Sequence, residues 1–207
     1  MSEATQLIEG ARALGLELSG ERAAALLKLL DELERWNAAY NLTAIEGRPA
    51  WLTHHLLDSL AIHADLAGQT VADVGTGAGF PGLPLALTSP ERQFTLIDSG
   101  GKKIRFVNHA LRALGLRNVT AVQARVEDLR PALPFDTIVA RAFASLRRLT
   151  DAVAGLVGTH TRVLALKGKH PTEELAELDA AWKVQEIRAL RIPGLDAERH
   201  LVVLARP

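Results

Sequence analysis

The segment 71–87, VADVGTGAGFPGLPLAL, places an acid and several glycines directly after a short apolar run. The apolar residues 71–74 are typical of a buried parallel strand. Gly75, Gly77 and Gly79 carry no Cβ atoms, so a ligand can lie directly against the turn that follows. Pro81 suits the first turn of a helix, where a missing N–H costs nothing. A strand, a glycine turn and a helix in this order predict a site for a nucleotide-like cofactor.

Two cofactors fit such a turn. Residues 77–82 match GxGxxG, the dinucleotide fingerprint, and Asp98 ends the next apolar run, where an acid holds ribose hydroxyls. Asp73 favours S-adenosylmethionine (SAM), because a carboxylate there repels a pyrophosphate but attracts the ammonium group of a methionine moiety. Val126 and Glu127 favour SAM as well, since a backbone amide and an acid after the third strand can meet an adenine edge. We therefore predict SAM as the cofactor, with NAD as the alternative.

Residue types that the chain lacks narrow the reaction. The sequence contains no cysteine, which excludes disulfides, thiolate metal sites and a cysteine nucleophile. Residues 141–145, RAFAS, contain no carboxylate and no Asn-Pro-Pro-aromatic motif of the kind expected for methylation of an exocyclic amine. Guanine N7 has a free lone pair and no proton to lose, so direct in-line transfer to it needs no general base. No catalytic residue is certain, and Arg141 and Lys167 are the candidates that orient the substrate.

Positive charge is concentrated in the middle of a chain whose net charge is zero. Residues 1–98 contain 6 Lys/Arg and 13 Asp/Glu, whereas residues 99–170 contain 13 and 4. So basic a segment favours a polyanionic partner, although scattered charges on helix surfaces would give the same count. The candidate RNA contacts are basic residues at predicted helix starts and strand ends: Lys102, Lys103, Arg105, Arg147, Lys167, Lys169 and Arg199.

His54, His55, Asp58 and His63 resemble a metal set only superficially. Their spacing puts only some pairs on one helix face, and methyl transfer needs no catalytic water. We therefore predict no metal site. His55, Asp58 and Ser59 are expected instead to tie the N-terminal helices to the glycine turn.

Apolar periodicity divides the chain into a helical beginning and an alternating remainder. Residues 1–66 are predicted to be helical. Trp36 and Tyr40 are expected to lie in the core rather than on the surface, where they could stack on bases. Phe143 is likewise expected to pack in the fold. The predicted strands are 71–74, 94–97, 119–122, 137–140, 163–166, a segment near 182–190 and 201–205, and the predicted helices between them are 83–87, 102–114, 146–156 and 172–181. This alternation predicts an α/β fold of the Rossmann-like class I SAM-dependent methyltransferases. Its seven-stranded, mostly parallel sheet would occupy residues 67–207, with residues 1–66 as a helical cap in one compact unit.

No apolar run reaches the roughly 18 residues that span a bilayer. The first ten residues, MSEATQLIEG, contain neither a basic flank nor a signal-type apolar core. We expect a cytoplasmic protein without membrane contact, acting as a monomer.

Several motifs occur in a fixed order along nearly the whole chain. They are Trp36-Asn37, Tyr40–Thr43 (YNLT), His55–Ser59 (HLLDS), Asp73–Gly82 (DVGTGAGFPG), Leu96–Ser99 (LIDS), Arg125–Glu127 (RVE), Arg141–Ser145 (RAFAS), Leu166–Gly168 (LKG) and Glu198–Val203 (ERHLVV). In this order the motifs resemble the bacterial 16S rRNA guanine-N7 methyltransferase family, also called the glucose-inhibited division protein B family. Many members of the family carry Leu where this chain has Phe80, an apolar exchange that leaves the resemblance intact.

The resemblance implies cofactor contacts at Gly75, Phe80, Val126, Glu127 and Arg141. It implies SAM as methyl donor, with S-adenosylhomocysteine as product, and a guanine at position 527 of 16S rRNA in the small ribosomal subunit as substrate. Two alternatives to this interpretation come from other functional classes. One is an NAD-dependent oxidoreductase, and the other is a non-catalytic ribosome- or RNA-binding protein that retains a relic SAM fold.

Overall fold

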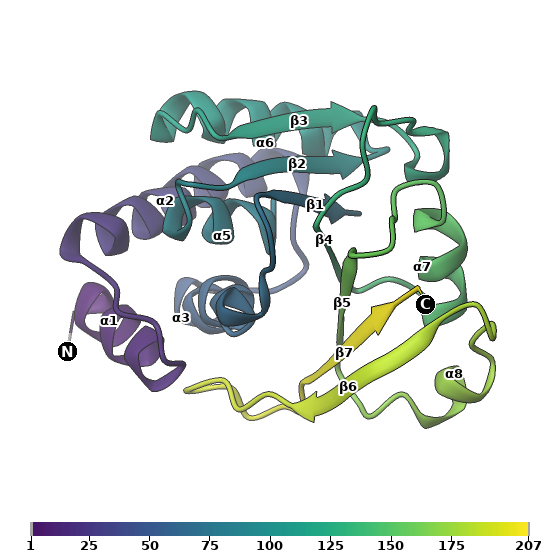
Figure 1. Ribbon diagram of the computed structural model, residues 1–207. Helices are drawn as coiled ribbons and strands as arrows, with labels where there is room; N and C mark the ends of the chain where they lie inside the picture. Colours follow the sequence, from purple (N-terminus) through teal and green to yellow (C-terminus); the bar gives the residue numbers. More distant parts are fainter. Residues whose placement is uncertain (1, 207) are drawn as a thin grey trace.

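The computed structural model describes residues 2–206 and contains a seven-stranded sheet with helices on both faces (Figure 1). The strands are β1 Thr70–Val74, β2 Gln93–Asp98, β3 Val119–Gln123, β4 Thr137–Arg141, β5 Arg162–Lys167, β6 Lys183–Ala189 and β7 His200–Ala205. Their order is β3-β2-β1-β4-β5-β7-β6. Strand β7 runs antiparallel to β5 and β6, while the other neighbouring pairs are parallel. The prediction of a seven-stranded, mostly parallel sheet is confirmed.

Helices from two parts of the chain cover one face of the sheet. They are α1 Glu3–Ala13, α2 Gly20–Tyr40, α3 Arg48–Trp51, a π-helical turn η1 at Leu52–Leu57, α4 Asp58–Leu60, α5 Gly82–Thr88 and α6 Gly101–Leu114. The other face packs against α7 Leu146–Val153, α8 Thr172–Ala176 and the 3-10 turn η3 Val126–Asp128. A further 3-10 turn, η2 His63–Asp65, leads into β1.

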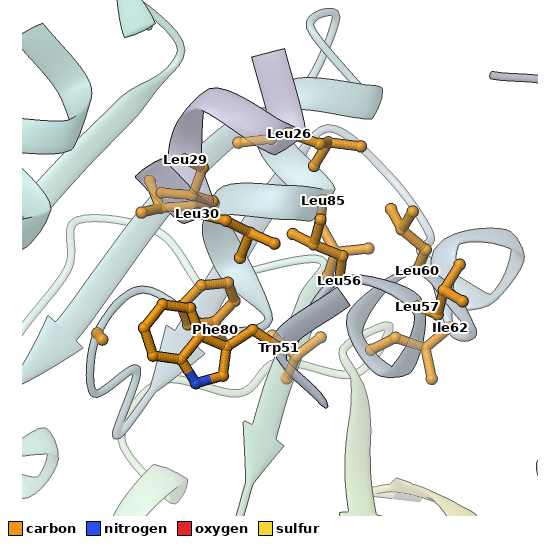
Figure 2. Close-up of a cluster of buried hydrophobic side chains, with 14 of the residues drawn as sticks. Leu26, Leu29, Leu30, Trp51, Leu56, Leu57, Leu60, Ile62, Phe80 and Leu85 are labelled. Carbon is orange, nitrogen blue, oxygen red and sulfur yellow. The ribbon is translucent and has the colours of Figure 1, made fainter. Parts of the chain in front are cut away.

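The N-terminal helices and the sheet share one hydrophobic core. Leucines recur at three- and four-residue spacing along α2, so Leu26, Leu30 and Leu33 all point to the same side and are fully buried. Figure 2 shows Leu26 and Leu30 of this helix facing Leu56 of η1 and Leu85 of α5. Burying a leucine completely stabilises the fold by about 1.5–3 kcal/mol. The face that carries the helices therefore holds residues 1–66 firmly against the sheet.

Three local features differ from the sequence-based expectation. Helix α8 ends at Ala176 instead of 181, because the Asp179 carboxylate accepts the N–H of Ala181 and forms a turn. Pro81 lies just before the first residue of α5 rather than within its first turn. Trp36 packs against the core, with its ring 5.8 Å from that of Phe106, but Tyr40 is 42% exposed and is not a core residue.

Within residues 2–206, no helix combines the length and the apolar character that crossing a membrane requires.

Candidate active site

The glycine turn after β1 is held by left-handed glycines and by backbone hydrogen bonds. Gly75, Gly77 and Gly79 have φ angles of 71°, 61° and 86°, a left-handed region that side chains disfavour. The N–H groups of Gly75 and Thr76 donate to the Ile97 carbonyl at 2.9 and 3.0 Å. Those of Gly79 and Phe80 donate to the Thr76 carbonyl. These hydrogen bonds fix the conformation of the turn at the carboxyl ends of β1 and β2.

Asp73 holds this turn from beneath. Its carboxylate is fully buried, and Oδ2 accepts the Thr76 hydroxyl at 2.5 Å and the Gly82 N–H at 2.8 Å. A Cβ at position 82 would lie 2.7 Å from that oxygen, so only glycine fits there. Burial raises the pKa of Asp73 to about 6. The predicted contact with a ligand ammonium group stays a prediction: Asp73 has no exposed surface, and its Oδ1 has no hydrogen-bond partner among the described residues.

Asp98, at the end of β2, holds the turn from the side. Its Oδ2 accepts the Gly77 N–H at 2.9 Å and its Oδ1 accepts the Gly100 N–H at 2.8 Å. Lys103, which was predicted to contact RNA, places Nζ 3.6 Å from the same carboxylate. Lys103 also lines the cavity beside Asp98, and its contact with RNA stays a prediction.

The hydrogen bonding of the turn separates the two candidate cofactors. A loop that binds a pyrophosphate must present free backbone N–H groups to it. Here those groups are used within the protein: the N–H of Gly77 by Asp98, that of Gly82 by Asp73, and that of Leu83 by the Gly79 carbonyl. The N–H groups of residues 75, 76, 79 and 80 are also donated internally, so the turn has few N–H groups left for a pyrophosphate and favours SAM over NAD.

A cavity of 350 Å³ lies beside the glycine turn, at the carboxyl ends of β1, β2 and β4. Five predicted cofactor residues line it: Gly75, Asp98, Val126, Glu127 and Arg141. Four others, Asp73, Gly77, Gly79 and Phe80, form the turn without lining the cavity. The sequence did not single out Arg125 at the rim, although it precedes the predicted pair 126–127. We call this space the cofactor cavity.

Phe80 connects the glycine turn to the N-terminal helices. Its ring is buried and stacks on the His55 ring at 4.6 Å between centroids, and the Arg141 guanidinium lies 5.7 Å from its centroid. His55 also contacts the Thr43 hydroxyl through Nε2 at 3.0 Å. Burial, together with the charge of Arg141, lowers the pKa of His55 to about 3. The structure thus agrees with the expected tie through His55, whereas Ser59 only donates to the His55 carbonyl.

A second cavity, of 520 Å³, lies on the other side of a short wall formed by residues 141–144. The lining comes from three parts of the chain: Ile45, His54 and Asp58; residues 141–144; and Leu166, Lys167, Gly168, Glu174 and Arg199. Arg141 and Phe143 border both cavities. Phe143 packs against the core of one sheet face, as was expected, and also lines both spaces. We call this space the second cavity.

Each cationic side chain of the second cavity is paired with a carboxylate. Asp58 accepts Arg141 Nη1 through Oδ2 at 3.2 Å and Arg199 Nε through Oδ1 at 3.0 Å. Lys167 Nζ lies 2.7 Å from the Glu174 carboxylate. Lys167 is only 10% exposed and is paired with Glu174, which speaks against its predicted role as a phosphate contact. Arg199 borders the cavity beside Asp58, and its contact with RNA stays a prediction.

The remaining predicted RNA contacts lie on the surface. Arg105 and Lys169 are exposed. Lys102 is exposed and donates to the Tyr40 carbonyl at 3.0 Å, and Arg147 is half-exposed, 3.5 Å from Asp151 on the same helix. These side chains remain predicted RNA contacts.

The histidines near Asp58 are engaged separately. The His54 carbonyl accepts Arg141 Nη1, His55 packs on Phe80, and His63 lies 3.2 Å from the Ser89 hydroxyl. In the described part of the chain, no three His, Asp or Glu side chains come together as a metal ion would require.

Comparison with known proteins decides the family. The model of the family described as "GidB: rRNA small subunit methyltransferase G" matches residues 22–202. The chain belongs to this family. Among its curated relatives, the ribosomal RNA small subunit methyltransferase G of Methylococcus capsulatus is 48% identical over 96% of both chains. The protein of the same name from Marinobacter nauticus is 44% identical over 97% of this chain and 94% of that relative.

Solved structures show the same fold at low sequence identity. A SAM-dependent methyltransferase from Aquifex aeolicus matches with a TM-score of 0.58 at 20% identity, over 76% of this chain and 94% of that one. TrmN from Thermus thermophilus matches with a TM-score of 0.59 at 21% identity, over 84% of this chain and 53% of that one. The predicted family and the predicted methyltransferase fold are confirmed, and the oxidoreductase alternative finds no support.

Proposed function

We propose that this chain transfers the methyl group of SAM to N7 of a guanine in 16S rRNA, at the position 527 that the family resemblance implies. One observation carries the proposal: the cofactor cavity and the second cavity share the wall 141–144. A donor bound in one space and a base bound in the other would meet at that wall. Membership of a family described as methylating small-subunit rRNA supplies the substrate class.

The residues of the cofactor cavity fit SAM. Asp98 has lone pairs beyond those used by Gly77 and Gly100, which suits ribose hydroxyls, and the exposed Glu127 at the rim suits the adenine side. A Cβ at position 75 would reach within 3.7 Å of the Phe143 ring and narrow the space between the glycine turn and residues 141–144. When bound, SAM supplies a methyl group on a sulfonium, which is already activated for transfer.

The second cavity suits a guanine base that enters from an unpaired region of RNA. Arginine donates to the O6 edge of guanine, and Arg141 borders both cavities. N7 must keep its lone pair free to accept the methyl group, so Arg141 would donate to O6 alone. No general base is needed. The two acids that line this cavity, Asp58 and Glu174, already hold cationic side chains. The contribution of the protein is alignment, which supplies about 7–11 kcal/mol in ideal intramolecular cases.

Exposed cations would hold the RNA around the two cavities. Lys102 and Arg105 lie on α6, Arg147 lies on α7 and Lys169 follows β5. Such contacts position the RNA without reading its sequence. Because one chain forms both cavities, we place the activity in a monomer. We place it in the cytoplasm, where bacterial ribosomal RNA is assembled into subunits.

The decisive experiment offers the protein isotope-labelled SAM together with naked 16S rRNA, assembling particles or complete small subunits. Mass mapping of the product should locate the label on N7 of one guanine. Binding of rRNA without transfer to any of the three substrates would support the relic-fold alternative. Calorimetry with SAM and NAD separately tests the cofactor, and tight binding of NAD alone would overturn the proposal.

A further inference from the structure

Asp58 lies at the meeting point of three distant parts of the chain. It begins α4, only 2% of it is exposed, and its two oxygens bind arginines that lie 83 and 141 residues further along the chain. Arg141 ends β4 and Arg199 directly precedes β7. Neither arginine side chain is more than about one fifth exposed, so water screens these ion pairs weakly.

The contacts of Asp58 fix the orientation of both guanidinium groups. Arg141 Nη1 is shared between Asp58 and the His54 carbonyl, at 3.2 and 2.8 Å. Arg199 is held through Nε by Asp58 and through Nη1 by the Glu198 carbonyl, at 3.0 and 2.8 Å. A guanidinium has five N–H donors in a plane, so further donors remain on each group. Both arginines line the second cavity, where those donors can meet a ligand.

The charges around the second cavity suit a base better than a phosphate. Arg141, Arg199 and Lys167 supply three positive charges, and Asp58 and Glu174 supply two negative ones. In the proposed reaction a positive charge passes from the sulfonium to the purine as the N7–methyl bond forms and the sulfur–methyl bond breaks. A cavity with three uncompensated cations would oppose that transfer. Paired carboxylates reduce the opposition while leaving arginine donors in place for O6.

We propose that Asp58 is a positioning residue for methyl transfer, which fixes Arg141 and Arg199 against the base and offsets their charge. The inference rests on the proposed function. An ordinary structural ion pair would account for the burial, but a buried ion pair contributes little net stability. A structural role alone would also not require both arginines to border the cavity beside the cofactor.

The test compares Asp58→Asn with the wild type and with Asp136→Asn. Asp136 is a matched control, because its carboxylate also holds protein groups, the N–H groups of Gln69 and Thr70, but at the opposite end of β1. Single-turnover methyl transfer to rRNA is measured at saturating SAM, together with the KM for rRNA, the Kd for SAM and the melting temperature. For Asp58→Asn we expect at least tenfold slower transfer, with the KM and the Kd within threefold of wild type. Asp136→Asn should transfer at the wild-type rate wherever it is folded.

Two further measurements keep the inference testable if Asp58→Asn folds poorly or if the reaction is a different one. Arg199→Lys keeps the charge and leaves Asp58 paired with Arg141, and it should show the same loss of rate with an unchanged KM. Nitrogen-15 NMR of the arginine side chains should show restricted guanidinium rotation at Arg141 and Arg199 in the wild type, and averaging in Asp58→Asn.

The outcomes separate the inference from the proposed function. Equal transfer rates for Asp58→Asn and Asp136→Asn would overturn the positioning role while leaving the function intact. So would arginine signals that stay unchanged in Asp58→Asn. A wild-type protein that binds SAM and leaves every guanine unmethylated would overturn the function, and the NMR comparison would then decide the positioning role by itself.

Discussion

The cofactor cavity and the second cavity use their carboxylates differently. Beside the cofactor cavity, Asp73 and Asp98 accept backbone N–H groups and so determine the shape of the glycine turn. In the second cavity, Asp58 and Glu174 are paired with cationic side chains that line it, and Glu174 also accepts the Leu146 N–H. The first cavity is thus built from local backbone conformation, and the second from ion pairs between distant parts of the chain. Substitutions should therefore affect donor binding and base transfer separately, except at the wall that both cavities share.

The largest effect is expected at that wall. Arg141→Lys keeps the positive charge but removes the planar set of donors that reaches Asp58 and the base. We expect methyl transfer to slow by about 100-fold, because a small displacement of aligned groups costs that much. The comparison is Arg188→Lys on β6, whose ion pair with Asp65 lies away from both cavities. Similar rates for the two variants would show that the wall has no special role.

His55 allows a test of stability, because burial makes its contribution to the free energy of unfolding depend on pH. Its folded pKa, about 3, lies below the ordinary value of 6.5, so the unfolded chain binds more protons between these values. The stability that neutral His55 contributes is complete above pH 6.5 and is lost as the pH falls toward 3. Asp73, with its pKa raised to about 6, acts in the opposite direction between about pH 4 and 6.

Replacing His55 by Phe should remove its share of the pH dependence and leave the contributions of Asp73 and of His63, whose pKa is also lowered by burial. Denaturant unfolding at pH 6.5 and 5.0 should show that the wild type loses about 2 kcal/mol more than His55→Phe on acidification. The exposed His160→Gln serves as the control and should keep the wild-type slope. An unchanged slope in His55→Phe would mean that His55 does not titrate as a buried group.

Asp98→Asn tests the cofactor cavity alone. The substitution weakens the charged hydrogen bonds to Gly77 and Gly100 and removes the ion pair with Lys103. Calorimetry should show a Kd for SAM that is about tenfold higher, with transfer at saturating SAM affected less. Asp136→Asn should bind SAM normally. If Asp98→Asn slowed transfer without weakening SAM binding, the assignment of the two cavities would be reversed.

The smallest effect is expected for rRNA binding, where an exposed lysine and a lysine held by a carboxylate should differ. Lys169 is exposed after β5, whereas Lys167, two residues earlier, is held by Glu174. Lys169→Gln should weaken rRNA binding a few-fold and reduce the salt dependence of binding by about one phosphate contact. Lys167→Gln should leave the salt dependence unchanged. Filter-binding measurements across a range of salt concentrations give both slopes. Equal reductions of the slope in the two variants would mean that Lys167 also contacts a phosphate.

Sequence reasoning reached the cofactor cavity because its determinants are local. Gly75, Gly77 and Gly79 are needed for their left-handed φ angles, and the position of Asp98 follows from the end of a strand. The alternation of strands and helices likewise predicts the sheet, because each element must bury an apolar face.

The second cavity could not be predicted in the same way. Glu174 looks like any acid in a short helix until the fold brings it beside Lys167, and Arg199 meets Asp58 across 141 residues. The sequence also did not show that Asp73 holds Thr76 and Gly82 or that Lys103 lies beside Asp98, because spacing does not tell which way a buried or half-buried side chain turns. The π-helical turn η1 has no pattern in the sequence that would have indicated it.

The antiparallel placement of β7 has a consequence for the order in which the protein matures. Every residue that lines the cofactor cavity lies between positions 75 and 144, whereas the second cavity needs residues from 45 to 199. Contacts between residues so far apart in the chain close late, because the entropy of the long intervening loop must be overcome first. The residues that line the cofactor cavity are therefore all synthesised before position 145, whereas the second cavity must wait for Arg199.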